Sequence, residues 1–143
     1  MKAAPGSRSW QGPGKTARDG DFPELLALDR AATGEDRRLL LSSMARGAQV
    51  VRRTTGGLDG AYLPELGTGA VMARTEKAGR ALLRAKLGTS GGRIVVPEEN
   101  AAALGFLTGM GYRESLRYPR MVLGPEPPWN PAWIWSRGSG WGG

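Results

Sequence analysis

Three short apolar segments in the middle of the chain, separated by glycine-rich turns, constrain the fold most. The segments are AQVVRRT (48–54), LDGAYLPELG (58–67) and GAVMA (69–73), and each is long enough for one strand. Gly56 and Gly57 predict a tight turn between the first two segments, and Pro64 weakens the end of the second. We therefore expect an antiparallel meander over residues 48–73.

An amphipathic helix is predicted directly after this meander, in TEKAGRALLRAKLG (75–88). Thr75 is a suitable N-cap, because its hydroxyl can accept a backbone N–H of the first turn. Gly88 is expected to end the helix. One stripe of the helix is apolar, so it should pack on the sheet; the stripe holds Ala78, Ala81, Leu82 and Ala85.

Two helices are predicted before the meander. DFPELLALDRAATG should begin near Pro23 with Asp21 as its cap, and end near Gly34. EDRRLLLSSMARG should be the second helix, ending at Arg46-Gly47. Its apolar face is expected to hold Leu40, Leu41, Met44 and Ala45.

After residue 88 the patterns alternate again. GRIVVP (92–97) predicts a buried strand, and NAAALGFLTGMG predicts a helix that Asn100 caps and Gly111 stops. YRESLRYPRMVLG (112–124) and the aromatic AWIWSR (132–137) predict two further strands, paired with each other. The expected order is two helices, three strands, helix, strand, helix, strand, strand, which is a mixed α/β fold.

Length and composition favour one domain. The chain has 143 residues, enough for a single core, and we place that domain at residues 21–143 with a glycine-rich end. Residues 1–20 offer little to bury, so we expect a disordered basic arm. This arm contains GPGKT, but the motif of phosphate-binding loops needs a glycine where Ser9 stands and a buried strand before it.

Several functional classes are excluded or disfavoured by composition. The chain has no cysteine and no histidine, so thiolate or imidazole metal sites and imidazole bases are absent, and we expect no metal. No apolar run approaches the roughly 20 residues that span a bilayer, so we expect a cytoplasmic protein without a membrane partner. The net charge is +7, but the basic residues are scattered among acidic ones, so we do not expect nucleic-acid binding.

The segment VPEENAAALGFLTGMGY resembles the GNAT superfamily of acyl-CoA-dependent N-acetyltransferases. These proteins carry an Asn after their fifth strand, then Ala, Tyr, Gly and an aromatic residue at fixed spacings. Here the positions are filled by Asn100, Ala103, Leu107, Gly111 and Tyr112. Residues 22–142 as an ordered series are similar to the C-terminal domain of two-domain bacterial GNAT proteins. The resemblance implies the GNAT-like fold and acetyl-CoA as cofactor.

The resemblance also implies a coenzyme site at the start of the third helix, where GNAT enzymes bind the pyrophosphate in a loop reading Gln/Arg-x-x-Gly-x-Gly/Ala. The matching stretch is RTEKAG, and the candidate coenzyme-binding residues are Arg74, Thr75, Lys77, Gly79 and Asn100. Lys77 stands where a glycine lets the backbone approach the phosphate, so this loop is degenerate. The alternative is an ordinary capped helix start with an exposed lysine.

No catalytic residue is assigned. The family places its general acid, a tyrosine, where this chain has Leu107, which has no proton to donate. Other candidates have no distinguishing partner; they are Tyr112, Tyr118, Glu65, Glu98 and Glu99. Three more residues match the family pattern, although capping and a surface ion pair explain them as well: Asp29, Asp36 and Arg37.

Two main functions remain open from the sequence. One is the substrate-side half of an acetyltransferase, which works with a coenzyme-binding GNAT domain or as a homodimer on a small-molecule or peptide amine. The other is a non-catalytic interaction module, with the tryptophans of WNPAWIWSRGSGW as its adhesive surface. The same tryptophans could instead complete the core.

Overall fold

The computed structural model describes residues 15–89, 94–115, 117, 125 and 128–138, and every structural statement below refers to these residues. They form a mixed α/β fold, as expected. The elements in chain order are β1 (Lys15–Thr16), η1 (Asp19–Asp21), α1 (Phe22–Thr33), α2 (Arg38–Met44), β2 (Gln49–Arg52), β3 (Leu58–Leu63), β4 (Ala70–Ala73), α3 (Glu76–Thr89), α4 (Ala101–Gly109), η2 (Pro131–Trp133) and β5 (Ile134–Arg137).

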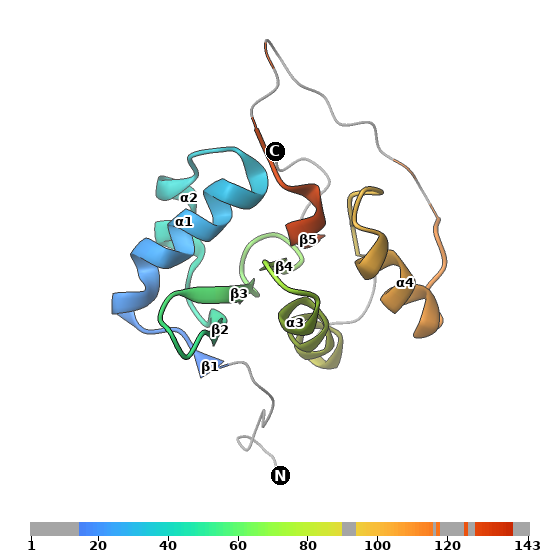
Figure 1. Ribbon diagram of the computed structural model, residues 1–143, viewed down its shortest axis with the longest axis horizontal. Helices are drawn as coiled ribbons and strands as arrows, with labels where there is room; N and C mark the ends of the chain where they lie inside the picture. The colour runs from blue at the N-terminus through green and yellow to red at the C-terminus, as the bar shows by residue number, and fades with distance from the viewer. Residues whose placement is uncertain (1–14, 90–93, 116, 118–124, 126–127, 139–143) are drawn as a thin grey trace.

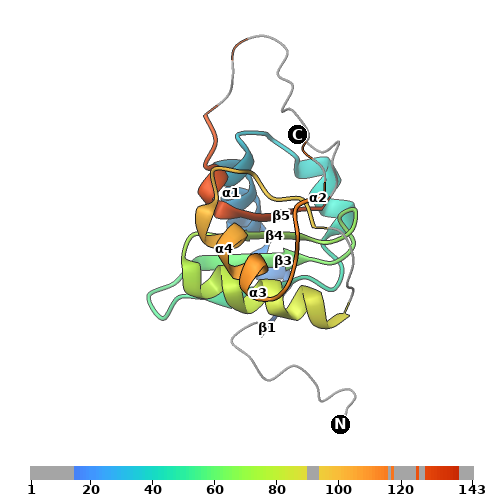
Figure 2. The same cartoon turned by 90° about the vertical axis from the view of Figure 1, so that its right-hand side faces the viewer.

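The five strands form one antiparallel sheet in the order β1-β2-β3-β4-β5. The predicted meander is confirmed, with Val50 opposite Ala61 and Ala61 opposite Met72. The last pairing joins distant parts of the chain, because β5 pairs with β4 although α3 and α4 lie between them in sequence. Figure 2 shows β3, β4 and β5 side by side.

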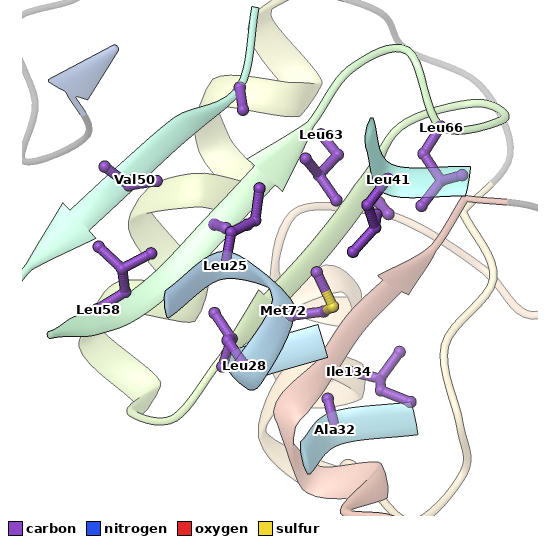
Figure 3. Close-up of a cluster of buried hydrophobic side chains, with 13 residues drawn as sticks. Leu25, Leu28, Ala32, Leu41, Val50, Leu58, Leu63, Leu66, Met72 and Ile134 are labelled. Carbon is purple, nitrogen blue, oxygen red and sulfur yellow. The ribbon is translucent and has the colours of Figure 1, made fainter. Parts of the chain in front are cut away.

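The sheet separates two helical layers, with α1 and α2 on one face and α3 and α4 on the other (Figure 1). Strand alternation divides the core accordingly. Met72 and Ile134 pack in the cluster on the α1 side (Figure 3), whereas Val71 and Trp135 pack in the cluster with α3 and α4. β4 and β5 therefore contribute to both cores.

Most predicted helix ends are confirmed. Gly34 takes a left-handed conformation (φ 77°), and its N–H donates to Arg30 O over 2.8 Å. Thr75 Oγ1 accepts from Ala78 N at 3.1 Å, and Asn100 Oδ1 accepts from Ala103 N at 3.0 Å. α3 runs to Thr89, one residue beyond the expected stop at Gly88.

Two details of the N-terminal helices were wrong. Asp21 makes no capping bond to α1; its carboxylate instead accepts from Arg18 N and from the Arg52 guanidinium. The hydrogen bond from Arg52 lowers the pKa of Asp21. Leu40 was expected on the buried face of α2, but only Leu41 is fully buried there and Leu40 is exposed.

The strand predictions after residue 88 were partly wrong. Ile94 to Pro97 form no strand, although Arg137 N donates to Val95 O at 2.9 Å and so holds this segment beside β5. Residues 112–115 and 117 form no strand either, and the rest of the segment predicted to pair with residues 133–135 lies outside the described residues. The observed partner of β5 is β4.

The N-terminal region is described from Lys15. Lys15 pairs with Val50 and Thr16 with Gln49, so residues 15–20, which we expected in a disordered arm, begin with an edge strand of the sheet. In this position Lys15 and Thr16 do not begin a helix, as a phosphate-binding loop would require. For residues 1–14, which lie outside the described residues, the arm stays a prediction.

Candidate functional site

The start of α3 holds most of the predicted coenzyme residues, but their side chains diverge. Arg74 Nε donates to Leu58 O at 3.1 Å, and the guanidinium lies 4.9 Å from the ring centre of Trp133. The Thr75 hydroxyl caps α3. Lys77 is exposed. Glu76 pairs with Arg80 at 3.3 Å, which puts a carboxylate in the first turn, where an anionic ligand would otherwise be favoured.

Gly79, the last residue of the predicted loop, is covered by Trp135 of β5. A Cβ atom at position 79 would lie 2.5 Å from Trp135 Cζ2 and closer still to Cε2 and Cδ2. The indole is 1% exposed, and its Nε1 has no hydrogen-bond partner among the described residues. A glycine is therefore required here by the packing of β5 on α3, whether or not a phosphate binds.

Asn100 is buried between α4 and β5. Its Oδ1 caps α4, and its Nδ2 donates to Ile134 O at 2.8 Å. One bond satisfies a backbone N–H of the first turn of α4 and the other joins α4 to β5, which accounts for an asparagine, with its acceptor and its donor, at this position. Its coenzyme role stays a prediction.

The position of the family's general acid is apolar. Leu107 packs in the core between α3 and α4. Tyr112 is half-buried against the same cluster, and Tyr118 lies outside the described residues. The carboxylates of Glu65, Glu98 and Glu99 are exposed, so the structure does not bring these candidates together.

Asp29 and Arg37 form an ion pair that is buried, not at the surface as the sequence analysis allowed. Arg37 Nη2 lies 2.5 Å from Asp29 Oδ1, and Arg37 Nε lies 3.0 Å from Oδ2. The exposed fractions of the two side chains are 1% for Asp29 and 9% for Arg37. Asp36, by contrast, is exposed and accepts from Arg38 N at 3.2 Å. The pair fixes the junction between α1 and α2.

A small hollow lies beside this ion pair, between the α1–α2 junction and strands β4 and β5. Its volume is about 10 Å³, room for about one water molecule. Its polar lining consists of Thr33, Arg37, Ser136 and Arg137. The hollow combines two basic residues with two hydroxyl groups on the face of the sheet opposite α3.

A family model described as an acetyltransferase (GNAT) domain matches residues 25–135. The match covers most of the chain, from α1 to Trp135 in β5. The chain belongs to the GNAT acetyltransferase family. Neither a curated protein nor a solved structure gives a match. The resemblance read from residues 96–112 is confirmed.

The sequence analysis missed Lys86, a buried charged residue of this GNAT domain. Its Nζ donates to Thr68 O, and burial lowers the pKa of its ammonium group. The sequence did carry a signal, since Lys86 follows Leu82 by four residues and therefore lies on the apolar stripe of α3. The hydrogen bond from Lys86 holds α3 against the turn between β3 and β4.

The described residues were also compared with the requirements for a membrane-spanning helix and for a metal site. Within the described ranges, no helix is long and apolar enough to cross a membrane. In the same ranges, no three acidic side chains gather in a way that could hold a metal ion.

Proposed function

We propose that this GNAT domain supplies the acceptor side of an acetyl-CoA-dependent N-acyltransferase and depends on a coenzyme-binding GNAT domain as its partner. The capping of α3 by Thr75 is the observation that carries this proposal. A coenzyme pyrophosphate needs free N–H groups at a helix start, and here Ala78 N already donates to Thr75 Oγ1 while Gly79 N donates to Thr75 O. We also expect the protein to be located in the cytoplasm.

Two further features of α3 and α4 support weak coenzyme binding and slow turnover by this chain. The Lys77 side chain stands at the glycine position of the loop. Leu107 replaces the general acid, a group that typically contributes about 10²–10⁴-fold to the rate. An isolated chain with these features should bind acetyl-CoA poorly and turn it over slowly.

Isothermal titration calorimetry of the purified chain with acetyl-CoA tests the proposal. We expect no saturable binding in the micromolar range, and no thiol release above background with a panel of amines. Addition of a coenzyme-binding GNAT domain should produce thiol release. Micromolar binding that Lys77→Glu abolishes, or robust turnover by the chain alone, would show that this is a complete enzyme.

A second candidate function is a non-catalytic interaction module that keeps the GNAT fold. The described tryptophans do not support it in the form expected from sequence, because Trp135 is buried and Trp129 and Trp133 pack against the core; Trp141 lies outside the described residues. α2 supports it instead, since two adjacent apolar side chains, Leu39 and Leu40, are 86% and 39% exposed there. Light scattering measures whether the chain forms a homodimer or a complex with a partner, and whether Leu39→Glu abolishes that assembly. If it does, and if the intact complex acetylates no amine, the chain is an interaction module.

A further inference from the structure

We propose that the outer face of α4 is the contact surface of a homodimer, in which two copies of the chain pack antiparallel across a two-fold axis near Gly105. α4 lies at the side of the molecule away from α1 and α2 (Figure 1). The dimer is independent of the proposed function, because neither coenzyme nor amine takes part in it.

α4 has an apolar inner stripe that is covered and an uncharged outer stripe that is not. Ala103 and Leu107 are buried on the inner stripe, in the core shared with α3 and β5. The outer stripe follows the helical spacing i, i+3, i+4, i+7 and consists of the exposed residues Ala101, Leu104, Gly105 and Thr108. The sequence has no charged residue from Asn100 to Tyr112. A helix without a charged face is normally buried on all sides, so the outer stripe fits a covering partner.

The outer stripe permits a close contact between two helices. Nothing lies within 4 Å of a Cβ atom added at Gly105 or Gly109, so a neighbour can approach the backbone of α4 on this side. Leu104 is 39% exposed beside Gly105. In a two-fold pair, Leu104 of each copy packs over Gly105 of the other copy, which removes both leucines from water by the same contact.

The charges at the two ends of α4 make a second copy the fitting partner. Glu99 precedes the helix and Arg113 follows it; both are exposed, and neither forms an ion pair within the described part of the chain. Gly105 lies six residues after Glu99 and eight before Arg113. An antiparallel pair that crosses near Gly105 therefore places Glu99 of each copy beside Arg113 of the other. A parallel pair would place like charges together, which is unfavourable.

The size of the contact predicts a reversible dimer. α4 has nine residues, which corresponds to a length of about 14 Å at 1.5 Å per residue. Two such helices alone bury less surface than the roughly 1,600 Å² of a standard protein–protein interface. We therefore expect a dimer that dissociates on dilution.

Analytical ultracentrifugation of the full chain over a concentration series measures the dissociation constant of this dimer. Leu104→Glu should raise the constant at least about tenfold, because the contact loses a buried leucine and gains a charge in an apolar place. Leu39→Glu is the matched control, since it changes an exposed leucine of α2, on the other side of the sheet. The control should leave the constant unchanged, and circular dichroism verifies that both variants fold.

Gly105→Leu distinguishes a close helix pair from non-specific apolar association. The added side chain increases the exposed apolar surface, which would strengthen non-specific association. It also keeps the two backbones apart, so it should weaken the close pair at least about tenfold. Gly88→Leu adds the same side chain at an open position of α3 and should leave the dimer unchanged.

Glu99→Arg and Arg113→Glu test the antiparallel arrangement. Each variant places like charges together at both ends of its own dimer, so its dissociation constant should rise about three- to tenfold. An equimolar mixture of the two variants pairs opposite charges at both ends and should restore the wild-type constant.

Several results would overturn the dimer. If the chain is monomeric at every concentration, a lowered melting temperature of Leu104→Glu would assign the outer stripe to a segment of the same chain. Loss of binding to the coenzyme-binding domain in that variant would assign the stripe to that domain. If Leu39→Glu dissociates the dimer and Leu104→Glu does not, the contact lies on α2. A dimer that Gly105→Leu tightens, or that neither charge variant weakens, is not the close antiparallel pair.

Discussion

At the scale of single residues, two positions that match a coenzyme motif are explained by packing in this chain. Gly79 gives space to the Trp135 indole, and Asn100 joins the start of α4 to Ile134 O. The sequence predicted the helix cap at Asn100 and placed Gly79 in a coenzyme loop. It could not reveal the partner, because Ile134 and Trp135 lie far away in sequence and no local pattern encodes that contact.

Gly79→Ala should destabilise the domain, although alanine is normally the better helix former. A methyl group at this position overlaps a rigid buried indole, and such overpacking typically costs about 1–3 kcal/mol. Gly88→Ala in the same helix is the matched control, because nothing lies within 4 Å of its added Cβ; it should stabilise by up to about 1 kcal/mol. Urea unfolding measures both, and equal effects would contradict the packing role of Trp135.

Lys86→Met should change how stability depends on pH. Burial lowers the pKa of Lys86, so the unfolded chain binds this proton more tightly than the folded chain. Wild-type stability therefore gains from this group as the pH rises from the folded pKa toward the unfolded value of about 10.4. The free energy of unfolding of wild type minus variant should increase over that range. If the free energies of unfolding of wild type and Lys86→Met change in parallel with pH, the prediction is refuted.

At the scale of elements, local signals predicted the helices well and the late strands poorly. Caps and glycines at Gly34, Thr75 and Asn100 act within a few residues, so they can be read from sequence. A strand needs a neighbouring strand to pair with, and a run of apolar residues does not indicate which strand that is. Ile94 to Pro97 are apolar enough for a strand but form none, while the short segment 134–137 pairs with β4.

Asn100 connects two elements, and two substitutions should separate its roles. Asn100→Ala removes the cap of α4, worth about 1 kcal/mol, and leaves Ile134 O without its donor, worth about 1–3 kcal/mol more. Asn100→Ser keeps a capping oxygen and loses the amide donor, so it should lie between wild type and the alanine variant. Thermal and urea unfolding test this order; identical losses would mean that the cap contributes nothing.

At the scale of the whole molecule, residues 129–138 bring the layers together. Asn130 N donates to Ala32 O at the end of α1, Arg137 N donates to Val95 O, and Thr68 N donates to Gly138 O. Ile134 enters the core under α1, while Trp135 enters the core under α3 and α4. A short segment thus completes both cores, and this packing accounts for Trp129, Trp133 and Trp135, whereas Trp141 lies outside the described residues.

Deletion of residues 129–143 should abolish cooperative folding of the domain. The deletion removes the edge strand beside β4 and opens both apolar clusters at once, and burying a large side chain typically contributes about 1.5–3 kcal/mol. Losing Trp133, Ile134 and Trp135 together would therefore approach the whole stability of an ordinary domain, about 5–15 kcal/mol. Removal of residues 1–14, a deletion of similar length from the expected arm, is the control and should leave the urea midpoint unchanged. If the truncated chain still unfolds in one cooperative transition at the wild-type urea midpoint, the prediction is wrong. The GNAT core would then be stable without β5.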